Sequence, residues 1–252
     1  MNRFFFGCML SLFGCTCNVP VKKDVSLSPY SSSDIPLDTC VDFNSLNTKI
    51  RDGFFSKEEA LMQVQTLIPK LKKYLDNKGR QEVAKSNTVF PVQGYKSNAI
   101  GGKNGSGYVA LGYDYFDGNK HGGHPAHDIF IEDINQDCID DNTKKTVNVL
   151  SMTGGIVIAT ENDWDIKSNL RGGKYIWIYD LFSNSFFYYA HNSKVLVQPC
   201  DIVKSGDTIA IVGRTGLNAF KKRSPTHLHI MQLKLDNDNY PRPVDCYKGL
   251  IN

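Results

Sequence analysis

The sequence lacks the features that mark several classes of protein. Its net charge of +3 is spread along 252 residues, which argues against a dedicated nucleic-acid-binding protein, because such proteins concentrate their basic residues. The one dense basic run, at 221–223, is interpreted as a solvated loop, with contact to an anionic polymer as the alternative. The glycine-rich turns at 151–157 and 169–175 do not lead from a strand into a helix, so no nucleotide-binding phosphate loop is expected.

The cysteines lack the CxxC spacing that is typical of structural zinc sites. Cys8 would be removed with an N-terminal signal, and the cysteines that remain in the body of the chain are Cys40, Cys138, Cys200 and Cys246. In an oxidising compartment four cysteines allow three pairings, and the sequence does not choose among them. Buried free thiols are the alternative interpretation.

The N-terminus carries an apolar stretch, residues 4–14, that is too short to span a bilayer but is typical of a secretory signal peptide. Residues 12–15 resemble a bacterial lipobox, in which Cys15 would be lipidated and become the first residue of the mature protein. Simple secretion and a buried N-terminal segment are the alternatives. We therefore expect residues 1–17 to be a signal and the protein to be exported to the bacterial cell envelope, touching membrane only through a lipid on Cys15.

The N-terminal part of the remaining chain is expected to hold a tether and a helical segment. Residues 18–43 are rich in Ser, Pro and Asp and have no sustained apolar period, which predicts a flexible tether. Within 44–87, Ser56 and Glu59 form a capping-box pattern, and apolar residues then recur every three or four positions. Pro69 either kinks one helix or starts a second one.

From about residue 88 the sequence predicts a mainly β domain that extends to residue 252. Short runs rich in β-branched and aromatic residues alternate there with clusters of Gly, Asn and Asp, and no segment has a convincing helical period. The expected strands lie within 107–116, 127–133, 154–160, 174–182, 185–191, 207–213 and 227–235.

Histidine is absent from the first 120 residues, and five of the six histidines sit in two clusters. In the first cluster the Gly and Pro residues of 122–125 favour a loop that runs into a strand. On an extended chain His124 and Asp128 share a face and can converge on one metal ion, whereas His127 points to the other face. His121, on the glycine-rich loop, is expected at the rim of such a site.

The second cluster, His227 and His229, lies two residues apart on a predicted strand, so both side chains face the same way. A catalytic zinc site has three protein ligands and leaves one position for water. His124 and Asp128 with one histidine of this pair would fill that set and leave the other histidine for proton transfer. His191, which ends an aromatic strand, is interpreted in isolation as a hydrogen-bonded structural residue.

In this order, the motifs resemble those of the lysostaphin/LytM-type zinc metallopeptidases. The matching pieces span roughly residues 88–235 and lie at 124–128, 153–157, 188–191, 203–213, 215–216 and 227–229. The resemblance implies an antiparallel β-sheet groove with zinc on its floor. It also implies an enzyme that cuts peptide bonds in bacterial peptidoglycan.

The resemblance further implies a role for each site residue. Zn²⁺ would be held by His124, Asp128 and His229, while His191 and His227 would act in acid–base or transition-state chemistry. This chain departs from the family at His127, at Asn192, in the long basic loop after Gly216 and in an acidic insertion at 132–145. Because both loops would border the groove, the substrate is the least defined part of the prediction.

Other functions are compatible with parts of the sequence. A LytM-like module that binds the wall or activates another wall hydrolase would typically lack a zinc ligand, and this chain retains all of them. A peptidase of secreted proteins is a further option. A structural or carrier domain is suggested only by residues 203–213, which lack a suitably placed lysine. The insertion begins like a Ca²⁺ loop, but Cys138 and Lys144 stand where glycine and glutamate are needed.

Overall fold

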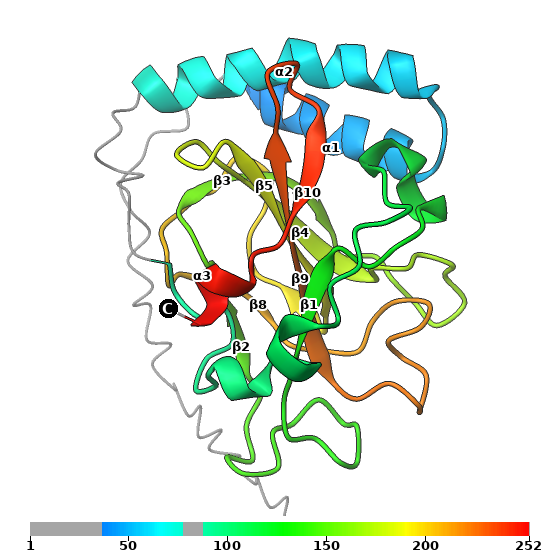
Figure 1. The fold of residues 1–252 in the computed structure, drawn as a ribbon, viewed down its shortest axis with the longest axis vertical. Helices are drawn as coiled ribbons and strands as arrows, with labels where there is room; N and C mark the ends of the chain where they lie inside the picture. The colour runs from blue at the N-terminus through cyan, green and yellow to red at the C-terminus, as the bar shows by residue number, and fades with distance from the viewer. Residues whose placement is uncertain (1–36, 78–87, 252) are drawn as a thin grey trace, which may run out of the picture. The chain divides into compact units, whose positions relative to one another are not determined.

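Two antiparallel sheets dominate the part of the chain that the computed structural model describes, residues 37–77 and 88–251 (Figure 1). The larger sheet has the strand order β1-β9-β5-β4-β3-β7, with β10 also paired to β9. Its strands are β1 (Ala126–Phe130), β3 (Gly155–Glu161), β4 (Lys174–Asp180), β5 (Ser185–Asn192), β7 (Ile202–Val203), β9 (His227–Leu235) and β10 (Pro241–Val244). The smaller sheet, in the order β2-β8-β6, consists of β2 (Asn148–Leu150), β8 (Thr208–Ile211) and β6 (Lys194–Val195).

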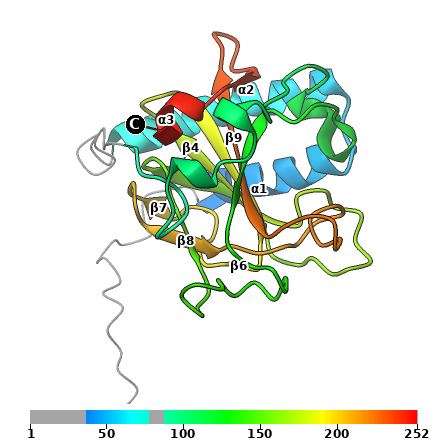
Figure 2. The same cartoon turned by 60° about the horizontal axis from the view of Figure 1, so that its bottom comes forward.

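The larger sheet is covered on both faces, so its central strands read as nearly continuous apolar runs. Helices α1 (Leu37–Arg51) and α2 (Lys57–Asn77) lie side by side against one face (Figures 1 and 2). The smaller sheet packs on the other face through a second apolar cluster. The predicted mainly β class with a helical N-terminal segment is therefore confirmed.

Helix α1 begins at Leu37, inside the range 18–43 that the sequence suggested to be a tether, so the prediction for 37–43 is wrong. Cys40, Phe43 and Ile50 are at most 3% exposed and pack against the sheet, which explains why this stretch is helical. Because these apolar residues are few and widely spaced in a polar stretch, the helical period is weak in the sequence. Residues 1–36, with the predicted signal and the predicted lipid acceptor Cys15, lie outside the described residues.

Helix α2 is continuous through Pro69, which resolves the two alternatives for this segment. Its predicted N-terminal capping box is present: Glu59 N donates to Ser56 Oγ over 3.2 Å, and Ser56 N donates to Glu59 Oε2 over 2.9 Å. The rest of the expected helical range, 78–87, lies outside the described residues. In the described part of the chain no helix is long and apolar enough to cross a membrane.

Residues 107–116 do not form the predicted strand. They run as turns from the 3₁₀-helix η2 (Lys103–Gly105) to η3 (Tyr115–Lys120), and the only ladder contact within them is an isolated bridge between Val109 and His124. Gly112 takes a φ of +81°, which favours a turn over an extended ladder. The short helices η1 (Ser97–Ala99) and α3 (Tyr247–Ile251) were likewise not predicted.

Asp114, at the N-terminus of η3, connects three elements. Its carboxylate accepts hydrogen bonds from Lys57 Nζ of α2, from the Tyr240 hydroxyl at 2.5 Å and from Phe116 N at 3.0 Å. Burial alone would raise the pKa of Asp114, but these hydrogen bonds outweigh it and lower the pKa. This contact fixes the loop that carries Tyr113 toward the site.

Candidate metal centre

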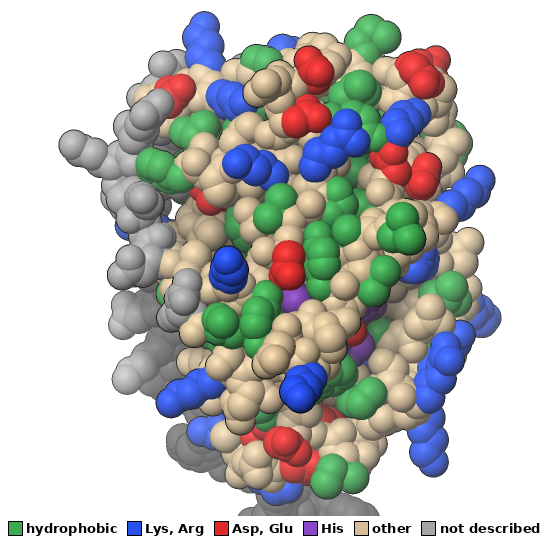
Figure 3. Space-filling model, viewed as in Figure 1, with side chains coloured by type: hydrophobic (Ala, Val, Ile, Leu, Met, Phe, Trp, Pro, Cys, Tyr) green, Lys and Arg blue, Asp and Glu red, His purple; other side chains and the backbone are tan. Residues whose placement is uncertain are grey.

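Strand register brings the predicted site residues together. Asp128 of β1 pairs with His229 of β9, and His229 pairs with Ala190 of β5, so these positions form one row across the sheet. His227 lies two residues before His229 and shares its face, as the strand period requires. The row lies on the same face as α1 and α2. In Figure 3 histidine and acidic side chains adjoin near the middle of the surface shown.

His124, Asp128 and His229 present three ligand atoms that all lie within 4.8 Å of one another. The Asp128 Oδ1 atom is 3.3 Å from His124 Nε2 and 3.0 Å from His229 Nδ1. Tetrahedral zinc with bonds near 2.0–2.1 Å separates its ligand atoms by about 3.3 Å. The two histidines and one carboxylate therefore fit a zinc ion in spacing and in chemistry.

The tautomer of His124 also suits a metal ligand. Its Nδ1 lies 3.0 Å from the carbonyl oxygen of Gly107, and because a carbonyl only accepts, Nδ1 must carry the proton. In the neutral ring the lone pair is then on Nε2, the atom that faces Asp128, whereas in the protonated ring Nε2 donates a hydrogen bond to Asp128. Such a hydrogen bond to the outer nitrogen is the usual way in which proteins orient a metal-binding imidazole.

Electrostatics favours a cation at this point. Burial alone would raise the pKa of Asp128, but hydrogen bonds from His124 and His229 hold it far below its ordinary value, so the carboxylate stays ionised. The hydrogen bond to Asp128 raises the pKa of His124, whereas burial lowers that of His229. A metal ion would displace any proton from these imidazoles.

Two further imidazoles stand beside the three candidate ligands. His227 Nδ1 donates to the carbonyl oxygen of Pro225 at 2.7 Å, and His191 Nδ1 donates to that of Thr215 at 2.8 Å. Each ring is thereby fixed with Nε2 as a free acceptor. His227 Nε2 lies 3.8 Å from Asp128 Oδ1, and the ring centroids of His191 and His227 are 4.8 Å apart. Burial lowers the pKa of His191 well below its ordinary value, so this ring is neutral at pH 7.

The position of His191 depends on an unusual local backbone. His191 itself has a φ of +68°, in the left-handed region that side chains other than glycine rarely adopt. Gly216, at a φ of +113°, packs against it so closely that a Cβ there would lie 2.9 Å from His191 Nδ1. Thr215 Oγ1 also donates to the Asn192 carbonyl at 2.8 Å, which ties this loop to the end of β5.

The five residues border a groove with about 820 Å³ of empty space. Its lining also includes residues to which the sequence analysis assigned no role in the site: Tyr113, Arg171, Tyr188, Asn218 and Met231. Tyr188 lies two residues before Ala190 on β5 and Met231 lies two residues after His229 on β9, so the strand period places both side chains on the face of the site. Tyr113 and Arg171 lie on loops, where no periodicity predicts their direction.

The other two histidines behave as their spacing predicted. His127 points away from the candidate ligands and is 1% exposed, with Nε2 at 2.8 Å from Asp245 Oδ1. His121 lies at the rim of the groove, against the ring of Tyr113 at a centroid distance of 4.8 Å.

Arg214 holds the long basic loop in place. Its guanidinium donates to the carbonyl oxygens of Ser224 at 2.7 Å, Lys221 at 3.0 Å and Phe220 at 3.3 Å. The acidic insertion is tied to the same loop, because Asp133 Oδ2 accepts from Thr226 Oγ1 at 2.6 Å. Asp133 also accepts from the backbone N–H groups of residues 137 and 138, so protein donors already satisfy the carboxylate that would begin a Ca²⁺ loop.

Residues 135–242 match the sequence profile of peptidase family M23. The match contains His191, His227 and His229, while His124 and Asp128 lie just before it. It confirms the family resemblance that the ordered motifs predicted.

Several solved structures are similar to the chain. A zinc-containing peptidase from Vibrio cholerae has 22% identity, with 65% of this chain and 40% of that chain covered and a TM-score of 0.42. The catalytic domain of the antimicrobial peptidase lysostaphin from Staphylococcus simulans has 24% identity, coverages of 58% and 88% and a TM-score of 0.38. A LytM protein from Ruminococcus gnavus has 22% identity, 86% of both chains covered and a TM-score of 0.43. This chain thus spans less than half the length of the Vibrio cholerae peptidase.

Proposed function

We propose that this chain, with a match to peptidase family M23 over residues 135–242, is a zinc-dependent endopeptidase that hydrolyses peptide bonds in bacterial peptidoglycan. One observation carries the proposal. Three ligand atoms of His124, Asp128 and His229 converge at the floor of a groove, beside two imidazoles that are fixed as proton acceptors. The groove has about 820 Å³ of empty space, and both basic and aromatic residues border it.

The residues that would hold zinc are His124 through Nε2, Asp128 through a carboxylate oxygen and His229 through Nδ1. When bound, zinc supplies Lewis acidity, which acidifies water and polarises the scissile carbonyl. The buried Asp128 carboxylate keeps the two imidazoles in place and supplies negative charge to the cation. No serine or cysteine nucleophile is needed.

The proton chemistry falls to His191 and His227. Each holds its Nδ1 proton on a backbone carbonyl and offers Nε2 as an acceptor, so either ring can take the proton of the attacking water. The resulting imidazolium then donates a hydrogen bond to the oxyanion and returns the proton to the departing amine. Because both imidazoles can transfer a proton, both are oriented in the same way, by a hydrogen bond from Nδ1 to a backbone carbonyl oxygen.

A digest of purified peptidoglycan tests the proposal. The full chain is expected to release new amino groups, to stop when a chelator is added and to resume when Zn²⁺ is restored. Mass analysis of the fragments identifies the bond. A panel of secreted proteins, run in parallel, measures whether the enzyme prefers protein substrates. Unchanged digestion in the presence of chelator would contradict a zinc mechanism.

The rival function is a non-catalytic module that binds the wall or activates another hydrolase. Its signature would be one bound zinc per chain without any new amines in the digest. The retained set of three candidate ligands and two oriented imidazoles favours the enzyme. We also propose that the protein works outside the cytoplasm, because its substrate lies there, and that Cys15 anchors it. Metabolic labelling with a fatty acid, compared between the parent and Cys15→Ser, tests the anchor.

A further inference from the structure

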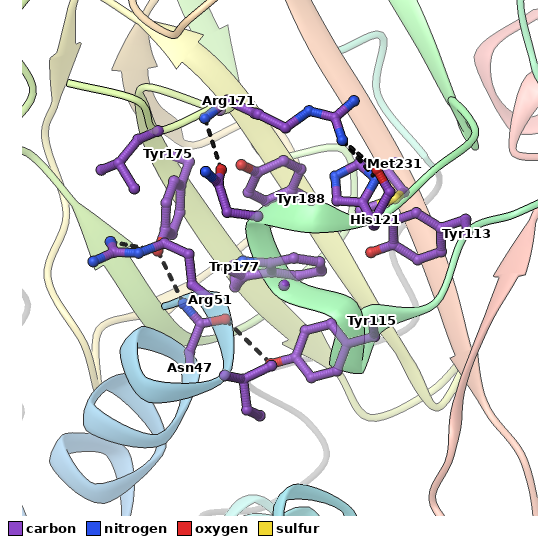
Figure 4. A pocket seen from close by; sticks show the side chains of 15 residues that line it. Asn47, Arg51, Tyr113, Tyr115, His121, Arg171, Tyr175, Trp177, Tyr188 and Met231 are labelled. Carbon is purple, nitrogen blue, oxygen red and sulfur yellow. Dashed lines mark hydrogen bonds between the residues drawn. The ribbon is translucent and has the colours of Figure 1, made fainter. Parts of the chain in front are cut away.

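A second pocket, with about 510 Å³ of empty space, opens from the side of the groove (Figure 4). The two cavities share six lining residues: Tyr113, His121, Arg171, Gly172, Tyr188 and Met231. The opposite wall of the side pocket is helix α1, through Asn47 and Arg51. Helix α1 lies before residues 135–242, so this wall of the pocket is not part of the region that matches the peptidase family.

The walls of the side pocket are aromatic and held by hydrogen bonds. Asn47 of α1 donates through Nδ2 to the Tyr175 hydroxyl at 3.1 Å and accepts from the Tyr115 hydroxyl at 3.1 Å. Trp177 lies between these two rings on the sheet and stacks near Tyr188, at a centroid distance of 4.4 Å. The pocket is therefore preformed, and its shape does not depend on a substrate.

The charged side chains that line the side pocket are all positive. Among the described residues that line it there are two arginines and no aspartate or glutamate. Arg51 is already neutralised, because its guanidinium contacts Glu161 Oε2 at 2.5 Å and Asp52 Oδ1 at 2.8 Å. Arg171 has no carboxylate partner in the described part of the chain, so its positive charge is the uncompensated one.

Arg171 is fixed at the junction of the pocket and the groove. Its backbone N–H donates to Asn119 Oδ1 at 2.9 Å, and its Nη1 donates to the carbonyl oxygen of His121. In Figure 4 the side chain extends across one end of the pocket toward His121, beside Tyr188. Its Nε and Nη2 atoms have no partner among the described residues, which leaves three N–H groups on two nitrogen atoms for a ligand.

We propose that the side pocket is a specificity subsite for a carboxylate-bearing side chain of the peptide substrate, with Arg171 as the residue that binds the carboxylate. Guanidinium and carboxylate are matched in charge and in planar geometry, and the aromatic walls accommodate the aliphatic part of the side chain. The inference rests on the proposed peptidase function. It adds that the scissile bond lies near an acidic residue of the substrate.

A carboxylate could also come from the end of a peptide. An endopeptidase holds a chain that continues through the groove, so a pocket at the side of the groove is suited to a side chain. Two hydroxyls at the junction support binding of a polar group there. These are the hydroxyls of Tyr113 and Tyr188, which line both the groove and the side pocket.

The test uses the fluorescence of Trp177, which lies in the pocket wall. The chain has two tryptophans, and Trp164 can be replaced by Phe because its buried Nε1 has no hydrogen-bond partner. In the zinc-loaded full chain carrying Trp164→Phe, three blocked peptides are titrated: acetyl-Ala-Glu-Ala-amide, acetyl-Ala-Gln-Ala-amide and acetyl-Ala-Ala-Ala with a free carboxyl end. The first carries only a side-chain carboxylate, the second carries none and the third carries only a terminal one.

We expect the Glu peptide to bind at least about tenfold more tightly than the Gln peptide, because one charge-assisted hydrogen-bond pair distinguishes them. Arg171→Gln should abolish this preference, and Arg171→Lys should keep part of it. The matched control is Arg242→Gln, the same change on β10 at a residue that lines neither cavity and should leave the preference intact.

Three results would overturn the proposal: equal binding of the Glu and Gln peptides, an equal loss of preference in Arg242→Gln, or selective binding of the free carboxyl end alone. The comparison of peptides on the Trp164→Phe chain does not require any arginine variant to fold. Because the titration measures binding, it is independent of the peptidoglycan digest. A failed digest with a preserved preference for the Glu peptide would contradict only the proposed reaction. A successful digest without that preference would contradict only the proposed subsite.

Discussion

Gly216→Ala should damage the site through two separable effects. The first is the backbone, because Gly216 has a φ of +113°, which residues with a Cβ rarely adopt. The second is contact: an added Cβ would lie 2.4 Å from the carbonyl oxygen of Arg171 and 2.9 Å from His191 Nδ1. The oxygen belongs to the backbone and cannot turn away, so the loop or His191 must move.

A matched control separates the two effects. Gly94 has a φ of +79° but no atom within 4 Å of an added Cβ, so Gly94→Ala carries the backbone effect alone. A left-handed residue with a Cβ costs roughly 1–2 kcal/mol. Forcing apart a packed contact costs about 1–3 kcal/mol more, so Gly216→Ala should lose roughly 2–5 kcal/mol.

The two variants should also differ in activity. A displacement of about 1 Å in a reacting group reduces the rate on the order of a hundredfold, so Gly216→Ala should digest peptidoglycan about that much more slowly while still binding zinc. Chemical denaturation gives the free energies of unfolding, and release of amino groups gives the rate. The reasoning is refuted if Gly216→Ala is no less stable than Gly94→Ala, or if it digests at the rate of the parent.

Three further predictions concern the scaffold. Hydrogen bonds lower the pKa of Asp114, so its carboxylate stabilises the fold above the pKa of the unfolded chain, and this contribution is lost as the pH falls through the lower folded pKa. Asp114→Asn should therefore cost about 1–2 kcal/mol at pH 7 in denaturant titrations, and less as the pH falls below the unfolded pKa. An equal loss at pH 7 and at the lowest pH at which the protein stays folded would contradict the assignment. Arg214→Met should leave the loop carbonyl oxygens that Arg214 binds unpaired, and so lower the free energy of unfolding by at least about 2 kcal/mol. Hydrogen exchange of the backbone amides in 217–226 should become faster. Unchanged exchange would show that Arg214 does not hold this loop. Cys40 and Cys200, whose thiols share a hydrogen bond, should form the disulfide on oxidation, and peptide mapping by mass spectrometry that finds another pairing would refute this.

The site was predictable from sequence because it depends on the two-residue period of strands. That period put His227 and His229 on one face and separated His127 from Asp128, and the structure has this arrangement. The motif order then brought His191 to the same place, although its left-handed backbone could not be foreseen. The strand period left open which histidine of the pair would bind zinc, and only the family resemblance singled out His229.

What the sequence did not predict depends on long-range packing. The start of α1 at Leu37 is set by contacts with the sheet, and the residues of 107–116 have strand-like composition but follow the turns that their glycines allow. Arg171 and Tyr113 come from such loops, and they meet α1 only in the folded protein, which is why the side pocket is invisible to periodicity. Likewise, only the packing of α1 brings Cys40 to Cys200.

Zinc content measured against hydrolysis, across five alanine variants, tests the central claim most directly. The account predicts about one zinc per parent chain, and loss of both zinc and hydrolysis when His124, Asp128 or His229 is replaced. It predicts that His191→Ala and His227→Ala keep the zinc but lose roughly two orders of magnitude or more in rate. Full zinc content in Asp128→Ala or His229→Ala, or parental hydrolysis in His191→Ala together with His227→Ala, would contradict it.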